Sequence, residues 1–217
     1  MRFTNFFQCQ YFCAISHTLR LEGRCYFSAV SYTIILRDGS LFDFSNPEKS
    51  LFSIKVIAHA LSNLCYASGH TRHFYSVAQH SFLVSNQVPK QYALSGMLYK
   101  SAQAFTGYLP SELAGLLPEH RNLELRVLKE ILVQHELPPV IPYCVRQAAR
   151  ALNATVRRDL MTKCAEKNVD LIGLSMLDHS ITPMFPTEAC RSFLTRYLEL
   201  TRSASHSVSS NERVSMY

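Results

Sequence analysis

The chain has 217 residues and a mass of 24.7 kDa, of which 47% are hydrophobic and 18% are charged. This composition can bury a core, so the chain is not expected to be disordered as a whole, and no apolar run reaches the roughly eighteen residues that a membrane span needs. The 22 basic and 16 acidic side chains leave a net charge of +6, which would suit an anionic partner such as a nucleotide or nucleic acid.

The N-terminal part of the chain predicts an extension followed by a hairpin. Residues 1–30 hold several aromatic side chains but show no clean period, so we treat them as an N-terminal extension of uncertain structure. The run SYTIIL, the turn Arg37-Asp38-Gly39-Ser40 and the run LFDF predict a β-hairpin over residues 32–44. Asp-Gly between two β-prone apolar runs is a strong hairpin signal.

Helices are expected over the rest of the folded region, because apolar residues recur there at steps of three and four. We expect them at about 52–65, 75–88, 91–106, around 123–132, at 143–167 and around 189–198. The fifth carries an exposed basic face of Arg146, Arg150, Arg157 and Arg158. From Arg202 to 217 the chain is Ser-rich and is expected to be a disordered tail. The predicted fold is all-α, a helical bundle over residues 31–201 with a small N-terminal hairpin.

Cysteine usage favours a reducing compartment. The seven cysteines are odd in number and no Cys-x-x-Cys spacing occurs, so neither a disulfide framework nor a structural zinc site is expected. The N-terminus reads as a poor signal peptide because Gln8 and Gln10 interrupt its apolar run. These features predict a cytoplasmic protein without a membrane anchor.

Histidines are concentrated in one stretch of the chain. His59, His70, His73 and His80 lie within 22 residues, which raises the prospect of a metal site. No Asp or Glu occurs between Lys49 and Ser111, however, and a hydrolytic metal centre would need carboxylates nearby.

A longer resemblance runs through this region. The segments ILRDGSLFDFSNPE, IAHALSNLC, GHT, YSVAQHS, ALSGMLYKSAQAFTGYLPSEL and AARALNATVRRDLM occur in order. Together they resemble the HD-type metal-dependent phosphohydrolases, in a bacterial and phage branch similar to the 5′-deoxynucleotidases, over about residues 32–200. The resemblance implies an HD-domain-like helical bundle and an active site of the pattern His…His-Asp…Asp, whose side chains would hold a divalent metal and activate a bound water.

Most of the residues that this resemblance would make functional are replaced. The first His matches His80, whereas the His-Asp pair falls on Tyr99-Lys100 and the last Asp on Ala149. The remaining replaced positions are a Glu that assists catalysis, here Gln103, an Asp, here Tyr108, and a substrate-gripping Arg, here Tyr66.

The replacements predict a vestigial site. Lys100 places an ammonium where an aspartate should neutralise a cation, and like charges repel strongly in a low-dielectric pocket. We therefore expect no bound metal or other cofactor and no catalytic residue. We expect a ligand site here instead, lined by Tyr66, His70, Arg72, His80, Tyr99 and Lys100.

Three hypotheses of function follow from these residues. The first is a pseudoenzyme that binds a protein partner or a nucleotide-like ligand, in the manner of a phage or mobile-element factor that interferes with host machinery. The second is an active phosphohydrolase with relocated ligands, His59, His70, His73 and His80, around one metal ion. The third is a binder of nucleotide or nucleic acid, in which Lys100, Arg72 and the tyrosines receive phosphate and base.

Overall fold

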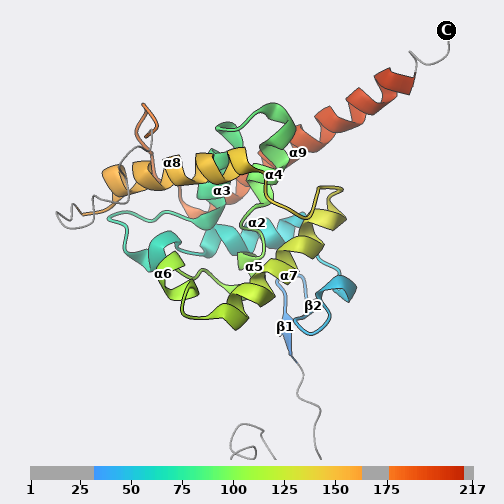
Figure 1. The fold of residues 1–217 in the computed structure, drawn as a ribbon, viewed down its shortest axis with the longest axis horizontal. Coiled ribbons are helices and arrows are strands. Elements are labelled where there is room, and N and C mark those ends of the chain that lie inside the picture. The colour runs from blue at the N-terminus through green and yellow to red at the C-terminus, as the bar shows by residue number, and fades with distance from the viewer. Residues whose placement is uncertain (1–31, 163–175, 213–217) are drawn as a thin grey trace, which may run out of the picture.

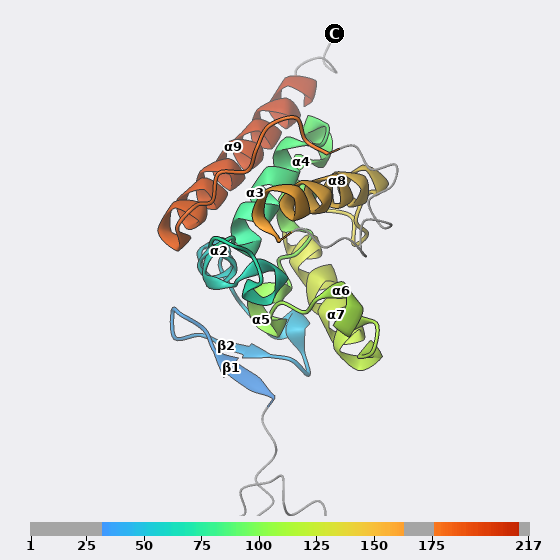
Figure 2. The same cartoon turned by 90° about the vertical axis from the view of Figure 1, so that its left-hand side faces the viewer.

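The structure, a computed structural model, describes residues 32–162 and 176–212. It is mostly helical, with a small two-stranded antiparallel sheet near the N-terminal end, as predicted. The hairpin lies at one end of the body, and the last turns of α9 (Pro186–Glu212) project from the opposite end (Figures 1 and 2). The expected extension over residues 1–30 lies outside the described residues.

The hairpin forms where the Asp-Gly signal places it. Strand β1 (Thr33–Ile35) pairs with β2 (Leu41–Asp43), and Ile34 faces Phe42 in the register. Gly39 has a φ of +83°, in the left-handed region that glycine adopts without a steric penalty. The Asp38 carboxylate accepts hydrogen bonds from the backbone and hydroxyl of Ser40, at 3.1 and 2.6 Å, which fixes the turn.

An aromatic cluster attaches the hairpin to the helices. Phe42 is fully buried, and its ring stacks on that of Phe105 with centroids 4.1 Å apart. Phe44 and Phe52 lie 5.2 and 5.9 Å from the Phe42 ring. Since a two-stranded sheet is not stable by itself, this cluster is what holds the hairpin against the body.

Helix α3 (Val77–Asn86) forms the centre of the bundle. It contacts α2 (Ile54–Asn63), α4 (Ala93–Leu98), α8 (Tyr143–Leu160) and α9. Both α2 and α3 begin at a serine whose hydroxyl accepts a backbone hydrogen bond, Ser53 from Val56 and Ser76 from Gln79. Such a cap satisfies an otherwise unpaired N–H group and fixes where each helix starts.

The segment expected as one helix over residues 91–106 is broken. It consists of the short turn η3 (Lys90–Tyr92), α4 and α5 (Gln103–Thr106), with Tyr99 and Lys100 in the connection between the two helices. Here the backbone bonds run three residues back, from Ser101 to Leu98 and from Gln103 to Lys100, and the Ser101 hydroxyl also donates to the Leu98 carbonyl at 2.6 Å. Serine competing for a backbone acceptor in this way interrupts regular α-helix.

The helices expected around residues 123–132, 143–167 and 189–198 are present as α7 (Pro118–Gln134), α8 and α9. The short helix α6 (Ser111–Ala114) was not predicted, and α8 ends at Leu160, before the expected end at 167. The prediction of a disordered tail from Arg202 is wrong for its first part, because α9 continues to Glu212. No Gly or Pro occurs after Pro186, so nothing in the sequence ends the helix earlier.

A buried glutamine fixes the approach to α9. Gln79, on α3, donates from Nε2 to the Thr182 carbonyl at 2.7 Å and accepts at Oε1 from the Met184 backbone N–H at 3.0 Å. The carboxamide therefore pairs with one backbone carbonyl and one backbone N–H, as the backbone of a neighbouring strand would. This arrangement holds the extended chain before α9 against the first turn of α3.

Two further features concern the cysteines and the apolar character of the helices. Among the described cysteines, Cys65, Cys144 and Cys190 are free. Within residues 32–162 and 176–212, no helix combines the length and apolar character needed to cross a membrane.

Removing the aromatic anchor is expected to destabilise the fold. Phe42→Ala should cost about 3–5 kcal/mol of unfolding free energy, as for other large-to-small changes at buried aromatic residues. Leu41→Ala, at the neighbouring 57% exposed position, should change it by less than about 0.5 kcal/mol. Urea titration followed by circular dichroism measures both values, and equal effects of the two changes would contradict the anchoring role.

Candidate functional site

His80 occupies the first turn of α3 and is fully buried. Its ring stacks on that of Tyr66, with centroids 4.3 Å apart and an 18° angle between planes. Its Nδ1 lies 3.2 Å from the Tyr75 hydroxyl, while its Nε2 has no hydrogen-bond partner among the described residues. The imidazole is thus fixed through one nitrogen and leaves the other unused.

Four phenol rings gather around His80, and we call Tyr66, Tyr75, Tyr99 and Tyr108 the tyrosine cluster. The Tyr66 ring lies 5.6 Å from that of Tyr75 and 5.0 Å from that of Tyr108. Tyr99 lies 6.2 Å from the His80 ring, and its buried hydroxyl has no partner in the described part of the chain. The rings come from four separate loops and helix ends, so only the fold brings them together.

Lys100 points its ammonium at this cluster. Its Nζ lies 5.8, 5.5 and 5.7 Å from the ring centroids of Tyr66, Tyr99 and Tyr108. These distances are within the range of about 6 Å in which a ring face attracts a cation. Among the described side chains of residues 32–162 and 176–202, the ammonium makes no hydrogen bond and no ion pair. Three aromatic faces and the charge of Glu124 therefore act on it, and Lys100 is half-buried.

A carboxylate approaches the cluster from α7, and the sequence analysis missed it. The buried Gln103 donates from Nε2 to Glu124 at 3.0 Å, and its Oε1 has no partner among the described residues. Glu124 is close enough for its charge to favour protonation of Lys100. The helical period of the sequence could have indicated that Glu124 faces the interior, because it shares a helical face with the buried Leu128 and Ile131.

Helix α8 supplies two more residues that were not predicted for the site. Asn153 accepts a hydrogen bond from the Tyr66 hydroxyl, at 2.5 Å. Arg157 is close enough for its charge to lower the pKa of Tyr66, against the larger upward effect of burial. Both follow the buried Ala149 at helical steps of four, so they share its face of α8. Arg157 had been assigned to a solvated face, yet it is only partly exposed.

The turn that carries Tyr66 is strained. Within η2 (Tyr66–Gly69), Ala67 and Ser68 have φ values of +50° and +53°, in the left-handed region that costs a side-chain-bearing residue energy. The base of the loop is closed by backbone bonding of Tyr66 to Tyr75 at 2.8 Å. Strain of this kind persists only where surrounding contacts impose it.

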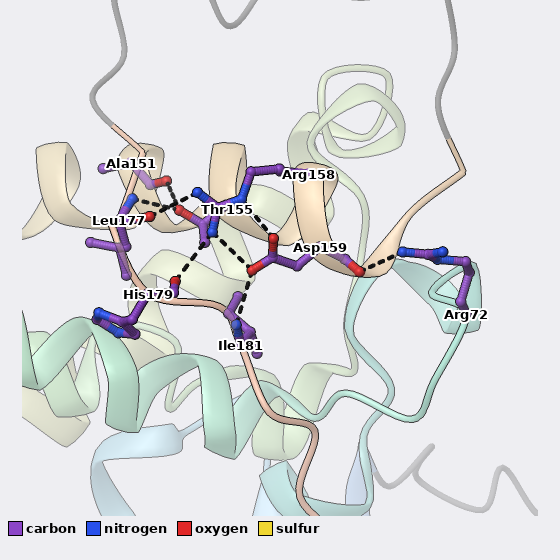
Figure 3. A network of polar contacts seen from close by, with 8 residues as sticks. All are labelled: Arg72, Ala151, Thr155, Arg158, Asp159, Leu177, His179 and Ile181. Atoms are coloured by element: carbon purple, nitrogen blue, oxygen red, sulfur yellow. Dashed lines mark hydrogen bonds and ion pairs between the residues drawn. The ribbon is translucent and has the colours of Figure 1, made fainter.

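Arg72, expected in a ligand site, instead binds the end of α8 (Figure 3). Its backbone N–H donates to the Leu160 carbonyl at 2.7 Å, and its guanidinium donates to the Asp159 carbonyl at 2.6 Å. The last carbonyls of a helix lack partners within the helix, and a basic side chain satisfies them. Arg72 is therefore occupied by this cap and is not part of the tyrosine cluster.

Figure 3 also shows how the chain between Leu177 and Ile181 is held against the end of α8. Arg158 donates to the carbonyls of Leu177 and His179, at 2.8 and 3.1 Å, and forms an ion pair with Asp159. Asp159 accepts in turn from the backbone N–H of Ile181 at 2.9 Å.

The four-histidine metal site is not formed. His80 is fully buried, whereas His70 and His73 are exposed on the loop between η2 and α3. Among the described residues, no three side chains of His, Cys, Asp or Glu come close enough together to hold an ion. The hypothesis of relocated ligands is therefore wrong for this set, and His70 also lies apart from the aromatic contacts of the cluster.

The residues around His80 do not suit a divalent cation. Tyr99, Lys100 and Ala149 provide neither carboxylate nor imidazole, and Glu124 is engaged by Gln103. A protonated amine beside the one remaining imidazole would repel a metal ion at short range.

Burial sets the protonation states of His80, Lys100 and the tyrosine cluster. It lowers the pKa of His80 well below 6.5, and the nearby charge of Lys100 lowers it further. Burial also lowers the pKa of Lys100, with Glu124 opposing that shift. The pKa values of Tyr66, Tyr75, Tyr99 and Tyr108 are raised, mainly by burial. At neutral pH the imidazole and the phenols are accordingly uncharged.

The His80 shift predicts a specific loss of stability in acid. Below pH 6.5 the unfolded chain takes up a proton at this residue that the folded chain excludes, so stability falls as pH falls. His80→Gln should remove up to about 1.4 kcal/mol per pH unit from the slope of unfolding free energy. Equal slopes for wild type and His80→Gln between pH 5 and 6.5, in urea titrations, would refute the assignment.

The strained turn predicts a stabilising substitution. Ser68→Gly should raise the unfolding free energy by about 1 kcal/mol, because glycine adopts a positive φ without steric cost. Ser192→Gly, the same change inside α9, should lower it by about 0.5 kcal/mol through lost helix propensity. Thermal unfolding distinguishes the two, and a destabilised Ser68→Gly variant would show that the turn carries no such strain.

Comparison with known proteins places the chain in a family. No protein-family model matches it. It is 32% identical over 164 residues to "Uncharacterized protein YfdR" of Escherichia coli (strain K12), a match that covers 75% of this chain and 92% of YfdR. An alignment of that length and identity, over nearly all of the relative, shows that the chain belongs to the same family as YfdR.

Proposed function

We propose that this protein has an HD-type phosphohydrolase scaffold without catalysis and acts by binding a protein partner. The observation that carries the proposal is the Lys100 ammonium, which lies over three phenol rings beside the only imidazole of the cluster. The resemblance assigns a metal-binding carboxylate to that position. A fixed ammonium there supplies the opposite charge to the one that a metal-activated water requires.

The surroundings of His80 support the same proposal. A nucleophilic water needs a metal or a general base that can accept its proton, and His80 Nδ1 is already paired with Tyr75. Glu124 is the carboxylate whose charge reaches Lys100, and it accepts a hydrogen bond from Gln103 at one of its oxygens. The aromatic rings pack against one another and against the imidazole, which favours a structural over a reactive role for this part of the fold.

The partner follows by analogy and not from the site. Because the resembling branch is bacterial and phage-borne, we propose that the partner is a component of the host machinery with which the protein interferes in the cytoplasm. The free thiols of Cys65, Cys144 and Cys190 suit that reducing compartment. A role in nucleic-acid binding draws less support, since Arg72 is used to cap α8.

Phosphohydrolase assays test the loss of catalysis. The purified full chain should release no phosphate from deoxynucleoside monophosphates with Mg²⁺, Mn²⁺ or Co²⁺, and should retain no stoichiometric metal on elemental analysis. Metal-dependent release that His80→Ala abolishes would overturn the proposal.

A gain-of-function variant tests the assignment of positions. Tyr99→His, Lys100→Asp and Ala149→Asp, combined in one chain, recreate the ligand pattern implied by the resemblance around His80. This variant should bind Mn²⁺ stoichiometrically in calorimetry, and the variant with His80→Ala added should not. Failure of a folded triple variant to bind any divalent ion would show that these positions do not converge.

A further inference from the structure

The hydrogen-bonding groups around Lys100 lack acceptors. Its ammonium carries three N–H donors and makes no hydrogen bond to the described side chains of residues 32–162 and 176–202, and Lys100 itself is half-buried. The neighbouring Tyr99 hydroxyl is buried and unpartnered in the same part of the chain. Buried polar groups in folded proteins are nearly always paired, with protein, water or a ligand. The Tyr99 hydroxyl therefore has room for a partner beside an ammonium whose donors are free to bind it.

His80 adds a third donor. The Tyr75 hydroxyl and His80 Nδ1 share one hydrogen bond, whose direction depends on the imidazole tautomer. In the tautomer in which the hydroxyl donates, the neutral imidazole carries its own proton on Nε2, the atom without a described partner. The imidazole and the ammonium lie beside the same two rings, those of Tyr66 and Tyr99.

Charges of both signs surround these donors. Lys100 forms no ion pair, and the partly exposed Arg157 lies near enough to act on Tyr66. The charge of Glu124 reaches Lys100, and that of Glu112 reaches Tyr108. The Gln103 Oε1 atom is an unpartnered acceptor in the same part of the fold. Even with two lone pairs on this oxygen, the N–H and O–H donors of Lys100, His80 and Tyr99 outnumber the acceptor sites that it offers.

We propose that a small oxyanion, a phosphate or carboxylate group, binds without a metal ion at Lys100, His80 and Tyr99. Its several acceptor atoms would receive the ammonium, the Nε2–H and the phenol hydroxyl together, as charge-assisted hydrogen bonds. The proposal rests on the proposed function, because the site takes an anion only if no metal ion or metal-bound water occupies it. On this proposal the ammonium of Lys100 lets the vestigial site bind an oxyanion.

Anion titration of the full chain in EDTA tests this site. Sodium phosphate, sodium acetate and sodium chloride are added separately at constant ionic strength and pH 7, and binding is followed by calorimetry and thermal unfolding. Wild type should show a saturable response to phosphate or acetate and a weaker one to chloride. Lys100→Met should lose that response, and Tyr99→Phe, which keeps the ring, should weaken it about tenfold or more.

Lys90→Met is the matched control, because Lys90 is exposed and the change alters net charge by the same amount. It should bind as wild type does. Identical responses of Lys100→Met and wild type, no saturable response to phosphate or acetate, or an equal response to chloride would each overturn the oxyanion site. These results leave the phosphohydrolase assay unaffected, so the proposed function and the anion site can fail independently.

Discussion

The attraction between one ammonium and three phenol rings organises the middle of this protein. Lys100 lies in the break between α4 and α5, and the rings belong to the turn after α2, the residue before Lys100 and the loop after α5. Each contact of this kind contributes about 0.5–2 kcal/mol, more when the cation is desolvated. Three together, with the charge of Glu124, help to offset the cost of partly burying an ammonium that forms no ion pair in the described part of the chain.

Tyr99 and Lys100 lie in the break of the segment expected as one helix over residues 91–106. Backbone bonds run three residues back between Leu98 and Ala104, so the regular α-helix is interrupted there. The preceding helix packs tightly on α3, because a Cβ at Gly96 would lie 3.3 Å from the Ser85 backbone, so glycine lets α4 approach α3 closely.

Local signals were enough to predict most elements but not the groups that meet in the site. Asp38-Gly39 and the apolar periods placed the hairpin and the helices, since turn chemistry and burial of one face act over a few residues. The pairing of Tyr75 with His80, and of Tyr66 with Asn153, joins residues whose separation in the sequence carries no periodic signal. The charge of Arg72 suggests a ligand-site residue, but the sequence does not show that the last carbonyls of α8 lie beside it and need donors.

The Gln79 carboxamide has a mechanical consequence. It lies next to His80 in the sequence and ties α3 to Thr182 and Met184, four and two residues before α9 begins. A displacement of the first turn of α3 would thus be transmitted to the base of a helix whose far end projects beyond the body (Figure 2). Over a rigid rod with a rise of about 1.5 Å per residue, a small tilt at the base becomes a large sweep at the tip. The first turn of α3 and the C-terminal rod are therefore linked both through the Gln79 amide and through the direct packing of α9 on α2, α3 and α4.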